Sequence, residues 1–195
     1  MADGDVVTIA GITGNTNANG TFYVKVTTVG DSGHFGLYSD KALTTAIVGN
    51  GTYGGSPTCA VLFRLANIFR TVGGSGYITK IRLAVNSATW VDQLKIHFYG
   101  SLAASSLDNS PFTLLWANVD GSRLGYSLLP ALTTEGTGSD MSVALGVPGD
   151  GTSELPLFVK NLDNSQDLYF RVETLGTGTP TSGLPFHFEF SLDEN

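Results

Sequence analysis

The sequence of 195 residues contains little cysteine, little charge and no long apolar run. Its single cysteine, Cys59, cannot form an intrachain disulfide, which excludes a small secreted scaffold held together by disulfides. No segment reaches the ~18 consecutive apolar residues that a membrane-spanning helix requires. The acidic residues 1–5 lack the apolar core of a signal peptide, so we expect synthesis and folding in a cytoplasm.

Charged residues make up only 14% of the chain, and the formal net charge is −7. The Lys and Arg residues number 10 and form no run. Binding of naked nucleic acid requires clustered cations that displace counterions, and an acidic surface repels anionic membranes. The charge pattern therefore argues against nucleic-acid and membrane partners. A surface poor in Lys and Glu favours broad contacts with other proteins.

Apolar and polar residues alternate with a period of two along several segments, which is typical of antiparallel strands with one buried face. The clearest examples are residues 77–85, 94–99, 168–173 and 186–191. Glycine is abundant, at 25 residues, and turn signals rich in Gly, Pro and Asn separate the segments. The pattern predicts an all-β fold whose main part is an antiparallel β-sandwich or jelly roll.

A stretch containing Gly and Pro at residues 54–57 marks the expected domain boundary. Residues 1–57 are predicted to form a small N-terminal β-domain of about three or four short strands. Residues 58–195 are predicted to form the β-sandwich or jelly-roll domain, with about eight strands. The Gly-rich residues 73–76 are expected to form a hairpin turn, because they lack the Lys and the following helix of a phosphate-binding loop.

Cys59 and the three histidines are the first candidates for chemistry. Cys59 lies in an apolar run, so we interpret it as a buried small hydrophobic residue; a nucleophile would need a base that nothing in the sequence indicates. His34, His97 and His187 lie in strand patterns and are expected to face solvent or an interface. Their spacing is not that of metal ligands.

The densest acidic set comprises Asp150, Glu154, Asp163 and Asp167. A glycosidase needs two carboxylates across a sugar, but the contexts of Asp150 and Asp163 favour turn formation by Asp and Asn side chains. Asp140 and Asp150 lack the spacing of a calcium-binding loop. We therefore expect no catalytic residue, no cofactor and no metal site, and predict that the protein is not an enzyme.

The two tryptophans lie in different contexts. Trp116 ends an apolar run and is expected in the core. Trp90 lies between two predicted strands, where an aromatic ring can bind a sugar or a neighbouring subunit, or can cap one end of the sandwich. The sequence leaves both alternatives for Trp90 open.

The N-terminal part has a recognisable order of segments. Residues 6–26 predict strand, polar turn and strand, and residues 34–38 and the Gly-rich 48–55 follow. This order resembles a small β-domain, named after an insert in ubiquitin-activating enzymes, that recurs as an add-on module in structural proteins of tailed bacteriophages. The resemblance implies a domain that binds or decorates and does no chemistry.

The first strand of that domain begins almost at Met1, whereas members of the family usually have more residues before it. The domain is therefore expected to lack an edge strand. An exposed strand edge is a liability unless another strand pairs with it. We expect a neighbouring subunit or a capsid protein to supply the pairing along residues 5–10 by strand addition.

Residues 63–78, 111–118 and 167–174, with the closing Phe-rich strand, look like uncharacterised phage structural proteins encoded near the capsid genes. The resemblance implies a capsid decoration, or cement, protein made in the host cytoplasm and located on the virion surface. Its partners would be the major capsid protein and two further copies of itself, since such proteins are often trimers of β-sandwich or jelly-roll subunits.

Two other classes of function are weighed against decoration. A receptor- or glycan-binding module of a tail fibre or baseplate would use Trp90, Tyr99 or Tyr126 as sugar platforms. A glycan hydrolase on a sandwich would need a carboxylate pair with usable spacing, which the sequence does not offer.

Overall fold

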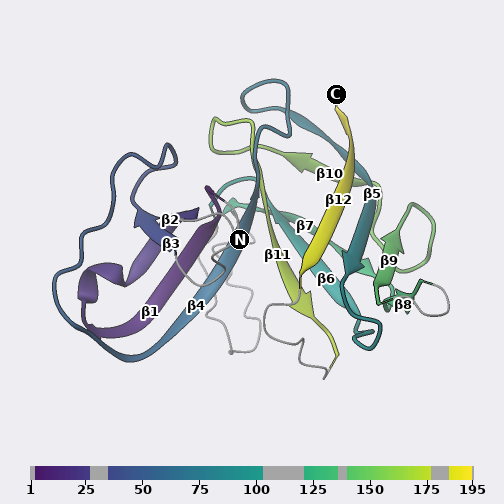
Figure 1. Ribbon diagram of the computed structural model, residues 1–195. Helices are drawn as coiled ribbons and strands as arrows, with labels where there is room; N and C mark the ends of the chain where they lie inside the picture. The colour runs from purple at the N-terminus through teal and green to yellow at the C-terminus, as the bar shows by residue number, and fades with distance from the viewer. Residues whose placement is uncertain (1–2, 27–34, 103–120, 136–139, 177–184, 195) are drawn as a thin grey trace. The chain divides into compact units, whose positions relative to one another are not determined.

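Antiparallel β-strands make up the protein, which confirms the predicted all-β class (Figure 1). The computed structural model describes residues 3–26, 35–102, 121–135, 140–176 and 185–194. Contacts between residues divide the chain into two units. Of the described residues, 3–26 and 35–64 form the first unit, and residues 65–102 with all those after 120 form the second.

The strands of the first unit follow the order β3-β2-β1-β4. They are β1 (Val6–Gly14), β2 (Gly20–Val26), β3 (Phe35–Tyr38) and β4 (Tyr53–Leu65). The predicted strand, polar turn and strand are confirmed, with a short 3-10 helix, Thr16–Ala18, in the turn. Asn19 fixes this turn, because its side chain bonds the N–H of Ile12 at 3.0 Å and the C=O of Ile12 at 2.8 Å.

A small apolar core stabilises the first unit. Val7 and Phe22 lie opposite each other on β1 and β2, so their side chains project to the same face of the sheet. The buried members of this core are Val7, Ile9, Ile12, Phe22 and Val24, and Leu37, Ile47 and Val61 pack against them.

β1 has a hydrogen-bonded neighbour on each side, so the open edge expected along residues 5–10 does not exist. Val7 lies opposite Phe22 of β2 on one side and opposite Val61 of β4 on the other. The expected strand addition at this segment is therefore wrong. The chain itself returns as β4 and supplies the neighbour from a distant part of the sequence.

β4 runs through residues 54–57, where the sequence suggested a boundary. Gly55 pairs with Ile12 beside a β-bulge, at which β4 has one residue more than β1, and a Cβ at Gly55 would collide with the carbonyl oxygen of Gly11. Both glycines have positive φ angles, of +83° and +94°, which the bulge requires. These glycines accommodate an irregular strand pair, and the division between the units falls after Arg64.

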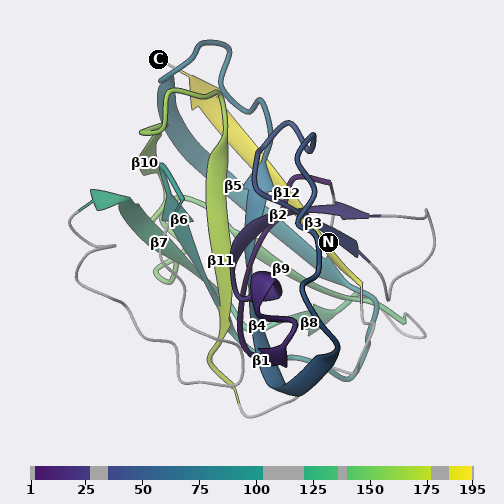
Figure 2. The ribbon, with the colours of Figure 1, turned by 90° about the vertical axis from the view of Figure 1, so that its left-hand side faces the viewer.

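The second unit contains two antiparallel sheets. One has the order β11-β6-β7, formed by Leu168–Thr174, Leu94–Tyr99 and Arg123–Leu129. In the other, β12 (Phe186–Glu194) pairs along one edge of β5 (Ser75–Val85), beside which it lies in Figures 1 and 2. The other edge of β5 pairs with β9 (Ser142–Gly146) and β10 (Leu157–Lys160), and β8 (Thr133–Thr134) follows β9.

Phenylalanine rings join the inner faces of these two sheets. Phe98 of β6 lies 5.8 Å from Phe190 of β12, measured between ring centroids, and Phe170 of β11 lies 5.4 and 5.2 Å from Phe188 and Phe190. All three pairs have the edge-to-face arrangement that aromatic rings prefer. The predicted inward set is confirmed in large part: burial is complete for Ile81, Leu83, Val85, Leu94, Ile96, Phe98 and Leu168, whereas Val172 is half-buried and Phe186 is 36% exposed.

Residues 73–76 form no hairpin, contrary to the sequence-based expectation: Gly73 and Gly74 end a loop, and Ser75 and Gly76 begin β5. β5 follows this loop and pairs with β9, β10 and β12 rather than with the preceding β4. The loop is fixed by contacts with another loop: the N–H of Gly73 donates to Ser165 O at 2.8 Å, and the N–H of Asn161 donates to Gly74 O at 2.9 Å.

Replacement of Phe170 by Ala should destabilise the protein by about 3–5 kcal/mol, because it removes a buried ring from between the sheets and leaves a cavity. The measurement is the free energy of unfolding in urea. Phe158→Ala is the matched control, since Phe158 is 45% exposed, and should cost less than about 1 kcal/mol. Equal losses for the two variants would contradict the assigned core.

Candidate functional site

Several residues singled out in the sequence are placed by the structure, and two are not. His34 and Trp116 lie outside the described residues. Cys59 lies in β4, where its backbone pairs with Ile9. Among the described residues, no three His, Cys, Asp or Glu side chains are grouped in a way that would hold a metal ion.

The carboxylates of Asp150 and Asp163 are engaged in loops, as their sequence context predicted. Asp150 Oδ1 accepts hydrogen bonds from the backbone N–H groups of Thr152 and Ser153, at 2.8 and 2.7 Å. These backbone hydrogen bonds lower the pKa of Asp150. Asp163 accepts hydrogen bonds from Asn161 Nδ2 at 2.7 Å and from the hydroxyl of Tyr169 at 2.9 Å. Turn formation is thus confirmed for both.

Trp90 and Tyr99 are too buried to serve as sugar platforms. Trp90 is 7% exposed, and its ring packs edge-to-face on Phe186 with centroids 5.2 Å apart. This contact matches the capping alternative. Tyr99 is 1% exposed. Tyr126 is partly exposed, with Lys95 Nζ 5.0 Å from the centre of its ring.

The side of the β5 sheet that faces away from the phenylalanine core carries a mixed set of exposed side chains, and we call it the outer face. Directly opposite residues of an antiparallel pair project to the same side. Tyr77 lies opposite Phe158, and Arg82 lies opposite Leu145 on one neighbour and Glu189 on the other. The outer face is therefore composed of Tyr77, Lys80, Arg82, Val143, Leu145, Phe158, His187 and Glu189.

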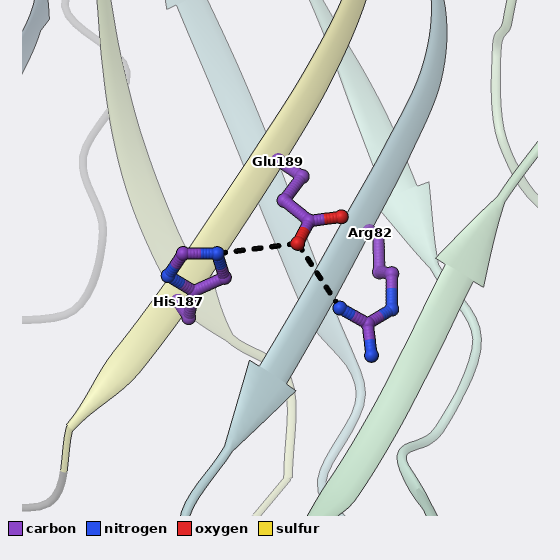
Figure 3. Close-up of polar contacts among 3 residues, drawn as sticks. All are labelled: Arg82, His187 and Glu189. Atoms are coloured by element: carbon purple, nitrogen blue, oxygen red, sulfur yellow. Dashed lines mark hydrogen bonds and ion pairs between the residues drawn. The ribbon is translucent and has the colours of Figure 1, made fainter.

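A polar trio occupies the middle of the outer face (Figure 3). Arg82 Nη1 lies 3.1 Å from Glu189 Oε1, and His187 Nε2 lies 3.2 Å from the same oxygen. Figure 3 shows Arg82 on β5 and His187 on β12 converging on this carboxylate. The exposed fraction of the side chain is 30% for Arg82, 71% for His187 and 51% for Glu189, so the trio is open to solvent. Such an exposed ion pair adds only ~0–1 kcal/mol to stability.

Apolar side chains flank the trio on both sides. Tyr77 and Phe158 are 40% and 45% exposed, and their rings meet edge-to-face with centroids 5.4 Å apart. Leu145 is 43% exposed. Beside His187 lies a pocket of about 240 Å³ whose lining includes Asp140 and Met141. Exposed apolar side chains gathered on one face are typical of a protein-binding surface.

β12 forms the edge of the outer face. It pairs with β5, and within the described part of the chain no strand pairs with its other edge. His187, Glu189 and Asp193 project outward from it, which is one way in which natural edge strands resist uncontrolled pairing. The edge presents the backbone groups that strand addition uses.

The alternating pattern indicated His187, Glu189 and Arg82 as polar residues of their strands, but it did not indicate that they meet. Their contact depends on the pairing of β5 with β12, across a sequence separation of 107 residues between Arg82 and Glu189. Phe158 went unnoticed, because its short strand carries only a brief alternation.

Comparison of the chain with models of known protein families, with curated proteins and with solved structures finds no match. A search of the described residues for a helix long and apolar enough to cross a membrane finds none.

The variant Asp150→Ala should be less stable than the parent protein at pH 7, because Asp150 holds its turn as a carboxylate. Since the pKa of Asp150 is lower in the folded protein than in the unfolded chain, its stabilising effect is present above about pH 4 and is lost as the pH falls further. The difference in urea midpoint between parent and variant should therefore shrink between pH 7 and pH 2.

Asp140→Ala is the control for this measurement, because Asp140 is exposed. It should leave the urea midpoint nearly unchanged at both pH values. A gap between the parent protein and Asp150→Ala that stays constant down to pH 2 would refute the role of the carboxylate.

Proposed function

We propose that this chain is a structural virion protein that decorates a bacteriophage capsid and stabilises it by bridging subunits of the major capsid protein. It acts as a homotrimer on the capsid surface, after synthesis in the host cytoplasm, and it uses no cofactor, nucleic acid or membrane. The observation that carries the proposal is the outer face, where Tyr77, Phe158 and Leu145 stand exposed around the trio of Arg82, His187 and Glu189.

The architecture proposed for the second unit is an antiparallel β-sandwich of the jelly-roll kind, with the first unit as a small N-terminal β-domain. Edge-to-face contacts of Phe98 and Phe170 with Phe188 and Phe190 support this, because a sandwich is held by side chains between two inner faces. Such a unit leaves the outer face of the β5 sheet available for partners.

The chemistry of the outer face suits a bridging role. Exposed aromatic rings supply contact area, and the partly hydrated charged groups between them add directional hydrogen bonds. On a symmetric shell the same contact is repeated many times, so avidity allows each single contact to be weak. Sites on a three-fold axis select binders with three-fold symmetry, which is the reason for proposing a homotrimer.

A receptor- or glycan-binding module of a tail fibre or baseplate is the second candidate. It is favoured by the exposed rings of Tyr77 and Phe158, since exposed aromatic side chains offer an apolar surface with a polar edge. The two candidates predict different locations in the virion and different ligands.

The deciding experiment is a copy count by quantitative mass spectrometry on separated heads and tails of the parent virion. Hundreds of copies in the head fraction are expected for a decoration protein, which occupies repeated sites on the shell. A few copies confined to the tail would overturn the decoration proposal in favour of the tail module. Absence from both fractions would refute both candidates.

The double variant Tyr77→Ala, Phe158→Ala should bind heads that lack the protein at least ~10-fold more weakly, because buried aromatic anchors dominate binding energy at interfaces. Binding is measured by co-sedimentation of purified protein with heads. Val72→Ala is the control, since Val72 is 64% exposed and lies in the loop before β5. Unchanged binding of the double variant would rule out the outer face as the contact.

A further inference from the structure

The side of the sheet β11-β6-β7 that faces away from the phenylalanine core is polar but largely buried. Arg171 lies opposite His97, and Tyr99 lies opposite Arg123 on the neighbouring strand. His97 is 3% exposed, Tyr99 1% and Arg171 7%. The sequence predicted that this side would face solvent or an interface, so the burial of its charged groups needs an explanation.

One carboxylate on this side already has its partners. Glu173 Oε2 lies 2.9 Å from His97 Nε2 and 3.7 Å from Lys95 Nζ. Burial lowers the pKa of His97 in spite of this hydrogen bond. A second carboxylate, that of Glu154, raises the pKa of the Tyr126 hydroxyl by its interaction with it. Neither acidic group is paired with an arginine of this sheet.

Arg171 and Arg123 lack an acidic partner within the described part of the chain. The Nε atom of each is buried, and neither Nε has a hydrogen-bond partner. The contacts that the guanidinium groups do make are with rings: Arg171 Cζ lies 5.9 Å from the centre of the Tyr99 ring, and Arg123 Cζ lies 5.3 Å from that of Tyr126.

Both arginines act on Tyr99. Burial raises the pKa of the Tyr99 hydroxyl, the positive charges of Arg171 and Arg123 both oppose that rise, and the negative charge of Glu173 adds to it. The two guanidinium groups are therefore close enough to one hydroxyl to influence it electrostatically. Two guanidinium groups near one hydroxyl are unusual in a chain that has only 10 Lys and Arg residues and a net charge of −7.

A buried charge is strongly unfavourable unless an opposite charge or several hydrogen bonds compensate it. Ring contacts compensate only part of that loss. The guanidinium group carries a fork of N–H donors that matches the two oxygens of a carboxylate, phosphate or sulfate. The missing partner of Arg171 and Arg123 is therefore expected to be an oxyanion.

We propose that Arg171 and Arg123, on either side of Tyr99, form a binding site for a small oxyanion: a phosphate, a sulfate or the carboxylate of an acidic side chain. Arg171 is the buried anchor, and Arg123, which is partly exposed, receives the anion from solvent. The site does not depend on the proposed capsid role, because it lies on a different sheet from the outer face.

The test is thermal unfolding of the full chain in rising sodium phosphate at pH 7, with sodium chloride at matched ionic strength as the reference. A ligand that binds only the folded state raises the melting temperature in a saturable way. We expect phosphate to do so and chloride not to. Titration calorimetry with phosphate then gives the affinity directly.

Arg171→Met should weaken phosphate binding about 10-fold or more, because it removes the charge-assisted hydrogen bonds of the anchor. Arg123→Met, at a less buried position, gives the same test if Arg171→Met fails to fold. Arg70→Met is the matched control, since the Arg70 side chain is 90% exposed and pairs with Glu194, and its phosphate affinity should equal that of the parent protein.

Equal stabilisation by chloride and phosphate, or unchanged phosphate affinity in both Arg171→Met and Arg123→Met, would overturn the site. Sulfate and acetate at the same ionic strength separate the two sources of the oxyanion. Binding of sulfate without acetate indicates a free tetrahedral anion, and binding of acetate as well indicates an acidic side chain of a partner. If phosphate does not bind, the decoration proposal still stands, because the copy count in heads and tails tests it independently.

Discussion

The packing of Phe188 and Phe190 against Phe98 and Phe170 is the contact on which the arrangement of the second unit depends. β12 pairs with only one described strand, β5, so ring contacts with the opposite sheet help to hold it in register. Because side chains alternate along a strand, turning these rings inward turns the intervening Glu189 outward. The position of the polar trio on the outer face is thus a consequence of core packing.

The sequence predicted the elements that depend on local pattern and missed those that depend on distant pairing. Alternation is a property of neighbouring residues, so the inward set such as Ile81 and Leu83 was predictable. The pairing of β1 with β4 joins Val7 to Val61, and no local signal distinguishes this neighbour from a strand of another subunit. The hairpin expected at residues 73–76 is absent for the same reason: which strands lie beside β5 depends on the whole sheet and not on the local sequence.

Polar side chains of this fold are not always exposed to solvent, and the alternating sequence pattern predicts only which residues are polar. The period of two on β6 and β11 correctly assigns Lys95, His97 and Arg171 to one side of the sheet. It does not reveal that His97 and Arg171 are at least nine-tenths buried. One signal was present: each strand places a tyrosine, Tyr99 or Tyr169, on the same side as its charged residues, and an aromatic ring offers a surface against which a charged group can be buried.

The partners of the charged groups give the two sheets different binding chemistry. Turn carboxylates such as Asp150 are satisfied by their own loops, so they contribute to net charge without leaving oxygens for other partners. Glu189 engages Arg82 on one sheet, whereas Arg171 on the other sheet has no carboxylate among the described residues. In the proposed roles, an exposed compensated pair would let apolar neighbours such as Tyr77 dominate contact with a protein, whereas a buried guanidinium with no carboxylate among the described residues would select its ligand by charge and geometry. The alternation that builds both sheets therefore yields two different polar sides, one exposed on the β5 sheet and one largely buried on the sheet β11-β6-β7.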